Sequence, residues 1–449
     1  MADDLSLPTT ATLRTLPRAI GTLGSTAIVV GTIIGSGIFL VPHNVARQVG
    51  SVEVLFAVWI LGGALAFAGA LSLAELGASI PEAGGVYVFL RQAYGGLFAF
   101  LYGWAELLVI TSGGIAALAV AFGIYSASLL PLSPLGEKLV AASVIAVLTA
   151  VNVVGVRESA IVQTIFTIAK LAGLAIIVGF ALFSPDVVPV AATGPLPVPH
   201  TTLSSFGIAL VAVLWAYNGW HHFSLAAGEV KDPGRVIPLS YLLGMLVIVA
   251  AYLVANLAYL RALPLPAMAE HQRVAASAME ALAGPRGASF VSVLILCSVF
   301  GALNGNVLAG PRVLFAMARD GVFFSAVARV HPRFKTPAAA VLVQGAWSLV
   351  LAMSGTYEQL FTYVIFAGMG FLGAAALAVV VLRRKRPDLP RPYRVWGYPL
   401  LPIAFALASL LIVASTLVSS PLESFIGLGL VLTGVPVYLA WRRRSARHP

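Results

Sequence analysis

The sequence predicts an all-α integral membrane protein with twelve transmembrane helices, arranged as two five-helix repeats of opposite orientation and two further C-terminal helices. Of the 449 residues, 59% are hydrophobic and only 10% are charged, whereas soluble domains carry about 25% charged residues. Charge-free runs recur along the chain, and each is long enough to cross the ~30 Å hydrocarbon core of a bilayer as a helix. This composition excludes a soluble globular enzyme and a disordered chain.

The twelve predicted spans follow one another from the first apolar run to the basic C-terminus. Four prolines between residues 187 and 200 predict a loop ahead of the sixth span. The spans occupy 19–46, 54–74, 107–136, 139–156, 160–183, the part of 187–228 that follows these prolines, 236–260, 287–311, 336–357, 359–382, 395–422 and 424–441.

We expect the whole chain to form a single domain, because no polar stretch is long enough to make a separate soluble unit. Its parts are a first repeat (20–183), a second repeat of inverted orientation (203–383), helices 11 and 12 (395–441), and two tails (1–18 and 442–449).

The net charge of +10 is explained by topology. With an even number of spans both termini share a side. If Arg442, Arg443 and Arg444 are cytoplasmic, most of the 27 Lys and Arg residues fall on the cytoplasmic side, which is the asymmetry of the positive-inside rule. We therefore predict a multi-pass protein of the cell (inner) membrane with both termini cytoplasmic, and no nucleic-acid partner. The first apolar run is too long for a cleaved signal peptide.

Two spans carry breaks that a lipid-facing helix does not tolerate. The first contains Gly31, Gly35 and Gly37, and the sixth reads LWAYNGW over 214–220. An unwound turn exposes amides and carbonyls, which is tolerated only where it is buried or lines a watery cavity. Alternatively, Gly31 and Gly35 only allow a neighbouring helix to approach closely. Because each broken span opens one repeat, the two breaks should meet near the bilayer midplane and form a substrate site there.

At these residues the chain resembles the amino acid/polyamine/organocation superfamily and, within it, the L-amino acid transporter family. The resemblance is nearly full length and is carried by eight segments in order: GSGIF (35–39), ELGASIPEAGGVYVFL (75–90), WAELL (104–108), VQTIFTIAKL (162–171), AYNGW (216–220), EVKDPGRVIP (229–238), GALNG (301–305) and RVLFAMARDG (312–321). It implies the five-plus-five (LeuT-like) fold of sodium-coupled amine and amino-acid carriers, working by alternating access.

The resemblance also implies the site. The substrate carboxylate would lie at the first break and the α-amino group at Ile33 and the carbonyls of the second break, with Trp215 capping the substrate. Carbonyls are suitable because an ammonium group needs acceptors. The residues implied at the two breaks are Ile33, Gly35, Ser36, Gly37, Trp215, Ala216, Tyr217, Asn218 and Gly219.

A side-chain wall is expected from the third, eighth and tenth spans. None of its members is charged, which disfavours cationic and acidic substrates. We therefore expect neutral L-amino acids, and small ones such as alanine, serine, threonine and cysteine because bulky aromatic residues narrow the space. The predicted wall consists of Val109, Ile110, Gly113, Ser298, Asn304 and Phe366.

Lys170 is a charged residue deep in the fifth span, which makes it a functional candidate. In the family this lysine stands where sodium-coupled relatives bind a cation, and its ammonium can bond carbonyls of the first broken helix. This implies sodium-independent exchange. Alternatively, Lys170 releases its proton and couples a proton symporter, or it extends to a membrane interface.

Other polar residues have the following expected roles. Glu106 in the third span is expected to be structural. His221 and His222 depart from the family pattern; we expect no metal there, because adjacent helical residues diverge by ~100°. Trp215, Glu229 and Arg319 are the candidate gating residues. A cytoplasmic network closing the inner gate, or simply a solvated loop, would comprise Glu229, Lys231, Asp232, Arg235, Arg319 and Asp320.

Neither a primary pump nor a membrane enzyme is expected, since neither a P-loop nor an HExxH motif occurs. No cofactor is expected. The external loop between spans three and four has no cysteine, and the chain has only Cys297, so a disulfide-linked heavy subunit is excluded. We expect a monomer or weak homodimer. An amino acid sensor or a channel with the same pocket remains the more distant alternative.

Overall fold

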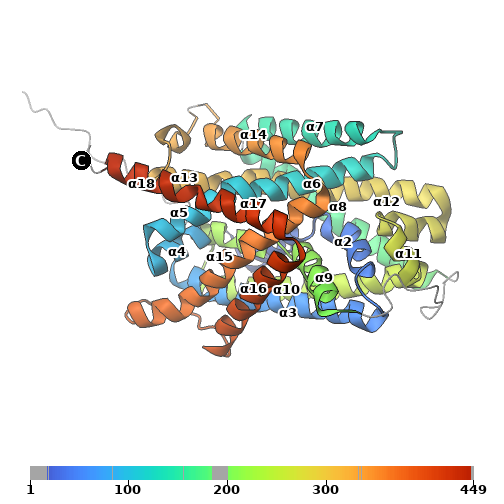
Figure 1. Ribbon diagram of the computed structural model, residues 1–449, viewed down its shortest axis with the longest axis horizontal. Coiled ribbons are helices and arrows are strands. Elements are labelled where there is room, and N and C mark those ends of the chain that lie inside the picture. Colours follow the sequence, from blue (N-terminus) through green and yellow to red (C-terminus); the bar gives the residue numbers. More distant parts are fainter. Residues whose placement is uncertain are drawn as a thin grey trace, which may run out of the picture.

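The computed structural model describes residues 18, 20–82, 84–154, 156–184, 201–331, 333–334 and 336–445. These ranges are helical, and their sole extended pairing is a single bridge between Ile20 and Val230. Most of the long helices run along one common direction (Figure 1). The proline-rich loop predicted before the sixth span, almost all of the predicted N-terminal tail (1–18) and half of the predicted C-terminal tail (442–449) lie outside the described residues.

The first half of the chain contains the two pieces of a broken span and the helices that follow it. They are α1 (Thr22–Ile33), α2 (Gly37–Ala46), α3 (Val52–Ser79), α4 (Val86–Tyr94), α5 (Gly96–Ala105), the π-helical turn η1 (Glu106–Ile110), α6 (Thr111–Ser126), α7 (Pro134–Val154) and α8 (Val156–Phe183).

The second half again begins with a broken span. Its helices are α9 (Leu203–Ala216), the 3₁₀ helix η2 (Trp220–Glu229), α10 (Pro233–Ala262), α11 (Leu265–Glu270), α12 (Val274–Ala309), α13 (Pro311–Arg319), the 3₁₀ turn η3 (Ser325–Ala328), α14 (Ala338–Ser354), α15 (Tyr357–Lys385), α16 (Leu400–Ser419), α17 (Pro421–Leu432) and α18 (Gly434–Ser445).

The all-helical membrane fold is confirmed. In the described ranges, nine helical segments are long and apolar enough to cross a bilayer, and the α1–α2 pair, bent by 45°, makes a tenth. Two shorter apolar helices, Ile168–Phe183 and Ala338–Ser354, stand where the fifth and ninth spans are predicted. The count of twelve and the inverted symmetry of the repeats remain predictions.

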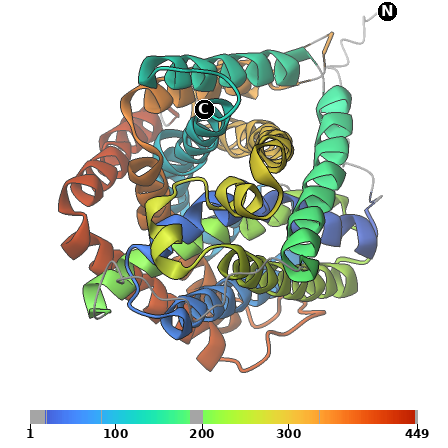
Figure 2. The ribbon, with the colours of Figure 1, turned by 90° about the vertical axis from the view of Figure 1, so that its right-hand side faces the viewer.

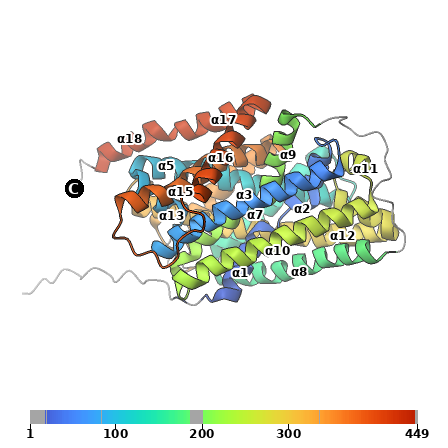
Figure 3. The same ribbon diagram turned by 90° about the horizontal axis from the view of Figure 1, so that it is seen from below.

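Helices from the two halves interleave. The end-on view shows early and late parts of the chain alternating around the bundle (Figure 2), and α12 packs on α8, α10 on α3, and α14 on α7. From below, α10 lies between α3 and α8 (Figure 3). Each half thus packs several of its helices against helices of the other half.

The bundle has two distinct ends. In Figure 1, α4, α13 and α18 lie at one end and α2 and α11 at the other. The first end holds Arg91 and Arg319, which the sequence places on the basic side, and the second holds Arg47 at the end of α2. Loops that the charge count assigns to one side therefore do share an end of the molecule.

Two helices that enter the core from the second end begin with reciprocal caps. Thr202 and Ser205 cap α9, and Thr356 and Gln359 cap α15, each pair bonding side chain to backbone in both directions. Such caps satisfy amides that have no partner within the helix. They fix where α9 and α15 start, and both helices carry aromatic residues that close the central cavity.

A buried ion pair ties α3 to the end of α15. Glu75 is 2% exposed and accepts two hydrogen bonds from Arg383, at 2.8 and 2.6 Å. It also accepts the backbone N–H of Val395 at 2.7 Å. The Arg383 guanidinium in turn lies 3.7 Å from the ring centre of Tyr398. This cluster links the α15–α16 connection to the bundle.

We expect Arg383→Ala to destabilise the protein markedly. The substitution leaves the Glu75 carboxylate buried without its main partner, and breaking a buried ion pair costs roughly 3–5 kcal/mol. Heating the purified variant in detergent and following the monodisperse fraction should show a transition several degrees lower. Arg384→Ala, which removes the exposed neighbouring arginine, is the control, and equal transitions for the two variants would contradict this assignment.

Candidate functional site

The break in the first span separates α1 from α2. α1 ends at Ile33 and α2 begins at Gly37, so Ile34, Gly35 and Ser36 are unwound. Ser36 supplies no side-chain cap to α2. The first amides of α2 are therefore presented at the positive end of a helix dipole, where an anionic group is favoured.

The break in the sixth span lies directly against the first one. After α9 ends at Ala216 the chain turns through Gly219, whose φ of 113° is the left-handed region that glycine favours. A Cβ on Gly219 would lie 2.4 Å from the carbonyl oxygen of Thr32, and a Cβ on Gly37 would lie 2.5 Å from the Cα of Ala216. The two unwound backbones thus touch at positions where only glycine fits.

Tyr252 of α10 joins the two breaks. Its hydroxyl lies 3.3 Å from the carbonyl oxygen of Ile33 and 3.0 Å from that of Ala216. Both carbonyls belong to the last residues of interrupted helices, where no intrahelical donor follows. One fully buried side chain thereby serves the C-terminal ends of both α1 and α9.

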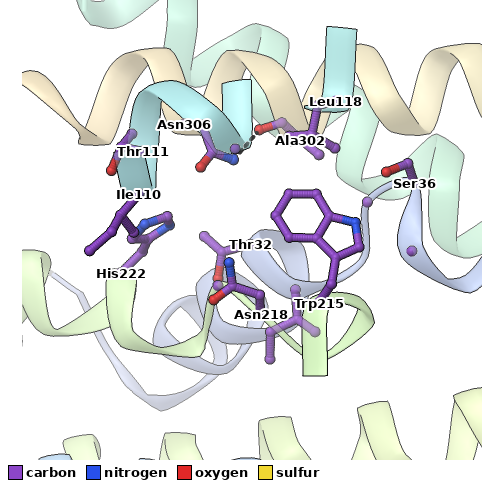
Figure 4. A pocket seen from close by; sticks show the side chains of 15 residues that line it. Thr32, Ser36, Ile110, Thr111, Leu118, Trp215, Asn218, His222, Ala302 and Asn306 are labelled. Carbon is purple, nitrogen blue, oxygen red and sulfur yellow. Dashed lines mark hydrogen bonds between the residues drawn. The ribbon is translucent and has the colours of Figure 1, made fainter. Parts of the chain in front are cut away.

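A small cavity lies between these breaks and the helices α6 and α12 (Figure 4). Its volume of about 30 Å³ accommodates the centres of one or two water molecules, so it is narrow. The lining residues are Thr32, Ile33, Gly35, Ser36, Gly37, Ile110, Thr111, Gly114, Leu118, Trp215, Asn218, Gly219, His222, Ala302 and Asn306.

The structure brings together most of the residues predicted at the breaks. Ile33, Gly35, Ser36, Gly37, Trp215, Asn218 and Gly219 line the cavity, together with Ile110 from the predicted wall. Ala216 and Tyr217 lie in the second break but do not line it. Gly35 also contacts Leu118 and Ala302. This glycine therefore both exposes backbone to the cavity and allows neighbouring helices to approach closely.

The rest of the predicted wall lies elsewhere. Gly113 faces Val364 of α15, Asn304 accepts a hydrogen bond from Asn152 of α7 at 3.0 Å, and Phe366 contacts Gly427 of α17. On α12 the cavity is lined by Ala302 and Asn306. Asn304 is two residues from Ala302 and two from Asn306, a rotation of about 200° around the helix axis, so its side chain points away from the cavity. Val109 and Ser298 are buried but do not line the cavity either.

Several lining residues were not identified from the sequence. All of them except Gly114 are labelled in Figure 4, around the same space as Trp215 and Asn218. In the third span, the π-helical turn η1 rotates the following helix relative to regular α-helical spacing, and no sequence signal marks this. The residues missed are Thr32, Thr111, Gly114, Leu118, His222, Ala302 and Asn306.

Lys170 reaches the first break from α8. Its side chain is 1% exposed, and its Nζ donates to the carbonyl oxygen of Ile34 at 2.7 Å and to that of Gly31. The predicted contact with the first broken helix is thus confirmed. Within the described residues no carboxylate pairs with this ammonium, so carbonyl dipoles alone stabilise its charge.

Aromatic residues of α9 and α15 close one side of the cavity. The indole Nε1 of Trp215 donates to the Tyr357 hydroxyl at 2.8 Å, and that hydroxyl lies 3.1 Å from Ser36 Oγ. Phe361 stacks on Trp215 with ring centres 6.2 Å apart and an angle of 20°. Because Tyr357 is the first residue of α15, this closure faces the end of the bundle that holds α2 and α11.

The opposite end is held differently from the expected network. Within the described residues no ion pair joins Glu229 to Arg319; instead Asp320 pairs with Arg91 and accepts the Tyr87 hydroxyl at 2.8 Å. Burial, and next the hydrogen bond to Asp320, raise the pKa of Tyr87, so its hydroxyl remains a donor. The backbone of the 229–231 segment is bonded on both sides to Ile20. The carboxylate that joins the helices at this end is thus that of Asp320, which binds Arg91 and Tyr87 of α4.

A second cavity of about 20 Å³ adjoins the first and shares Ile110 and Asn218 with it. Glu106 and His221 line this second cavity. The Glu106 carboxylate accepts the hydroxyls of Thr111 and Tyr102, which fits the expected structural role. His222 lines the central cavity, and its ring centre lies 4.3 Å from that of His221.

Comparison with known proteins gives a consistent result. The model of the amino acid permease family matches residues 20–437. The serine/threonine exchanger SteT of Bacillus subtilis (strain 168) is 34% identical over 436 residues, which cover 96% of this chain and 98% of that protein. The cystine/glutamate transporter of Homo sapiens is 32% identical over 438 residues (94% and 85%). The large neutral amino acids transporter small subunit 2 of Mus musculus is 34% identical over 439 residues (94% and 81%).

We expect Tyr357→Phe to loosen the aromatic closure. The change keeps the ring but removes the hydroxyl that joins Trp215 and Ser36, and each hydrogen bond contributes about 1 kcal/mol. Labelling of a Leu118→Cys reporter in a Cys297→Ala background by an impermeant maleimide should therefore become several-fold faster. Tyr363→Phe, about one and two-thirds turns along the same helix, is the matched control. An unchanged labelling rate would show that this hydroxyl does not hold the closure.

Proposed function

The chain belongs to the amino acid permease family, and from this premise we propose that it is a sodium-independent exchanger of small neutral L-amino acids. Family membership makes it a multi-pass membrane transporter of amino acids and not an enzyme. The substrate class, the sodium independence and the exchange mode are our proposal. We also place it in the inner membrane with cytoplasmic termini, acting without a disulfide-linked partner.

The chemistry of the central cavity supports a zwitterionic, neutral substrate. The amides at the start of α2 suit a carboxylate, and the carbonyls at the second break suit an ammonium group. Among its described lining residues none is Asp, Glu, Lys or Arg. A charged substrate side chain would be buried without a partner, at a large cost in free energy.

The limited space supports a small substrate. Trp215, Leu118 and Ile110 occupy much of the volume around the breaks. The relatives do not decide this point, because proteins named for serine and threonine, for cystine and glutamate, and for large neutral amino acids match at similar identity. The preference therefore rests on the cavity itself.

The observation that carries sodium independence is the bond from Lys170 to the carbonyls of Gly31 and Ile34. Carbonyl oxygens exposed at a helix break are the ligands that a sodium-coupled carrier offers its cation. Here a covalently attached ammonium occupies them. A fixed cation stabilises the break permanently, so no sodium gradient is coupled to substrate movement.

In the proposed mechanism the substrate binds across both breaks and lowers the barrier between the two closures. Opening at one end separates Trp215 and Phe361 from Ser36, and opening at the other releases the contacts of Arg91 with Asp320. Binding energy shifts this equilibrium only as far as the substrate prefers one state over another. The empty carrier, which lacks this contribution, crosses slowly, and exchange results.

The decisive experiment is uptake of labelled alanine, serine and leucine into proteoliposomes. We expect rapid uptake of alanine and serine into vesicles loaded with unlabelled amino acid, little into empty vesicles, and no dependence on sodium. Preferential leucine exchange would contradict the proposed size selection. Accumulation in empty vesicles driven by a pH gradient would instead establish the proton symporter. The structure is compatible with that outcome, because no acidic side chain among the described residues pairs with Lys170. Binding without any uptake would establish a sensor.

Lys170→Ala should reduce exchange by roughly tenfold or more. It removes two charge-assisted hydrogen bonds and leaves two buried carbonyls unsatisfied. Lys138→Ala is the matched control, since Lys138 also donates to a backbone carbonyl, that of Met353, but at the surface. Partial recovery of the Lys170→Ala variant by sodium would support the fixed-cation role, whereas exchange at the parental rate would remove it.

A further inference from the structure

A larger hollow lies beyond the aromatic closure. It has a volume of about 370 Å³ and is bordered by α2, α9, α15, α16 and α17. This is within the range of about 300–1,000 Å³ found for small-molecule sites. Unlike the central cavity, it is large enough for a free amino acid together with several water molecules.

The lining of this outer cavity is strongly polar for a hollow between membrane helices. It includes Asn44, Arg47, Gln48, Glu358, Gln359 and Glu423. Ionisable groups within a helical bundle are retained where they face water or a ligand, because exposure to lipid is costly. The side chains of Arg47 and Glu358 are 53% and 52% exposed, so the outer cavity opens to the aqueous phase at this end of the molecule.

Both signs of charge are present and partly organised. The guanidinium of Arg47 lies 3.9 Å from Glu358, a long separation for an ion pair, and Asn44 donates to the same carboxylate. Asn44 thus holds Glu358 in place while most of the five N–H donors of Arg47 remain available. Glu423, on the neighbouring α17, lines the same space.

Such a set complements a free amino acid. The planar fork of an arginine binds a carboxylate through two parallel hydrogen bonds, and Glu358 and Glu423 accept hydrogen bonds from an ammonium. A simple amine or a simple carboxylic acid would satisfy only one of these charges. The cavity thus has the chemistry to select the zwitterion and little that selects its side chain.

One layer of aromatic rings separates the outer cavity from the central one. Phe361 lines the outer cavity and stacks on Trp215, which lines the central cavity. Movement of this single stacked pair would connect the two spaces. A molecule in the outer cavity is therefore already next to the closure through which it must pass.

We propose that the outer cavity is a vestibule site that binds zwitterionic amino acids through Arg47 and the carboxylates of Glu358 and Glu423 before they pass the Trp215–Phe361 pair. This inference rests on the proposed amino acid exchange. The site raises the local concentration of substrate at one face of the membrane, because the residues that line it belong to the end of the bundle that holds α2 and the start of α15 (Figure 1).

The test is a comparison of the two faces in intact cells that express the full chain. Arg47→Gln should raise the KM for serine uptake about tenfold, since a charge-assisted pair is lost, with an unchanged maximal rate. The KM for efflux of serine from preloaded cells should not change. Glu423→Gln should shift the uptake KM in the same direction. Arg286→Gln, which removes an exposed arginine of α12 outside this cavity, is the matched control.

A second readout separates binding from a structural role. Exposed charges are screened by salt, so the uptake KM of the parent protein should rise with ionic strength and that of Arg47→Gln should rise less. Equal changes of the uptake and efflux KM would show that Arg47 acts on the central site or on folding, and an unchanged uptake KM would show that no vestibule site exists; either result overturns the inference. Absence of any serine exchange by the parent protein would instead refute the proposed function.

Discussion

The contact between the two helix breaks is the constraint on which the rest of the structure depends. Interrupting a helix inside a membrane leaves carbonyls and amides that lipid cannot satisfy. Here the two interruptions compensate each other: Gly37 lies against Ala216, Gly219 lies against Thr32, and Tyr252 serves a carbonyl from each break. α10 must therefore cross behind both breaks, and α6 and α12 must cover the remaining side, where the central cavity lies.

The carbonyls that remain at the end of α1 determine the role of Lys170. Tyr252 binds only Ile33 in this turn, whereas the oxygens of Gly31 and Ile34 accept from the buried ammonium. The lysine and the break are mutually dependent, because a buried cation needs acceptors and an unwound turn needs donors. A proton lost from Lys170 would weaken the same turn that presents the proposed carboxylate site. Fixed-cation exchange and proton coupling are thus two outcomes of one interaction.

The sequence was sufficient for features that follow from composition and from glycine, and insufficient for those that depend on helix rotation. Hydrophobic runs predicted the helical membrane fold, and the glycines at 35, 37 and 219 marked backbone that lines the cavity. Of the predicted third-span wall, Ile110 lines the cavity and Val109 and Gly113 do not, because the π-helical turn Glu106–Ile110 alters the register. In the eighth span, Asn304 lies two residues from the lining residues Ala302 and Asn306, and its side chain therefore faces Asn152 and not the cavity. The partner of Asp320 was missed because Arg91 is distant in sequence and only the tertiary fold brings it close.

The two closures differ in chemistry, and this difference bears on how an exchanger can work. The aromatic closure consists of one stacked pair and hydrogen bonds through a single hydroxyl, worth about 1 kcal/mol each. The opposite end combines a partly exposed ion pair, which contributes at most about 1 kcal/mol, with backbone bonds between Ile20 and the 229–231 segment. A ligand that binds with millimolar to micromolar affinity supplies roughly 4–8 kcal/mol in total, but only the part of this free energy that differs between the two states shifts the equilibrium. A small amino acid that contacts both breaks at once therefore favours opening only as far as it binds the open state more tightly than the closed one.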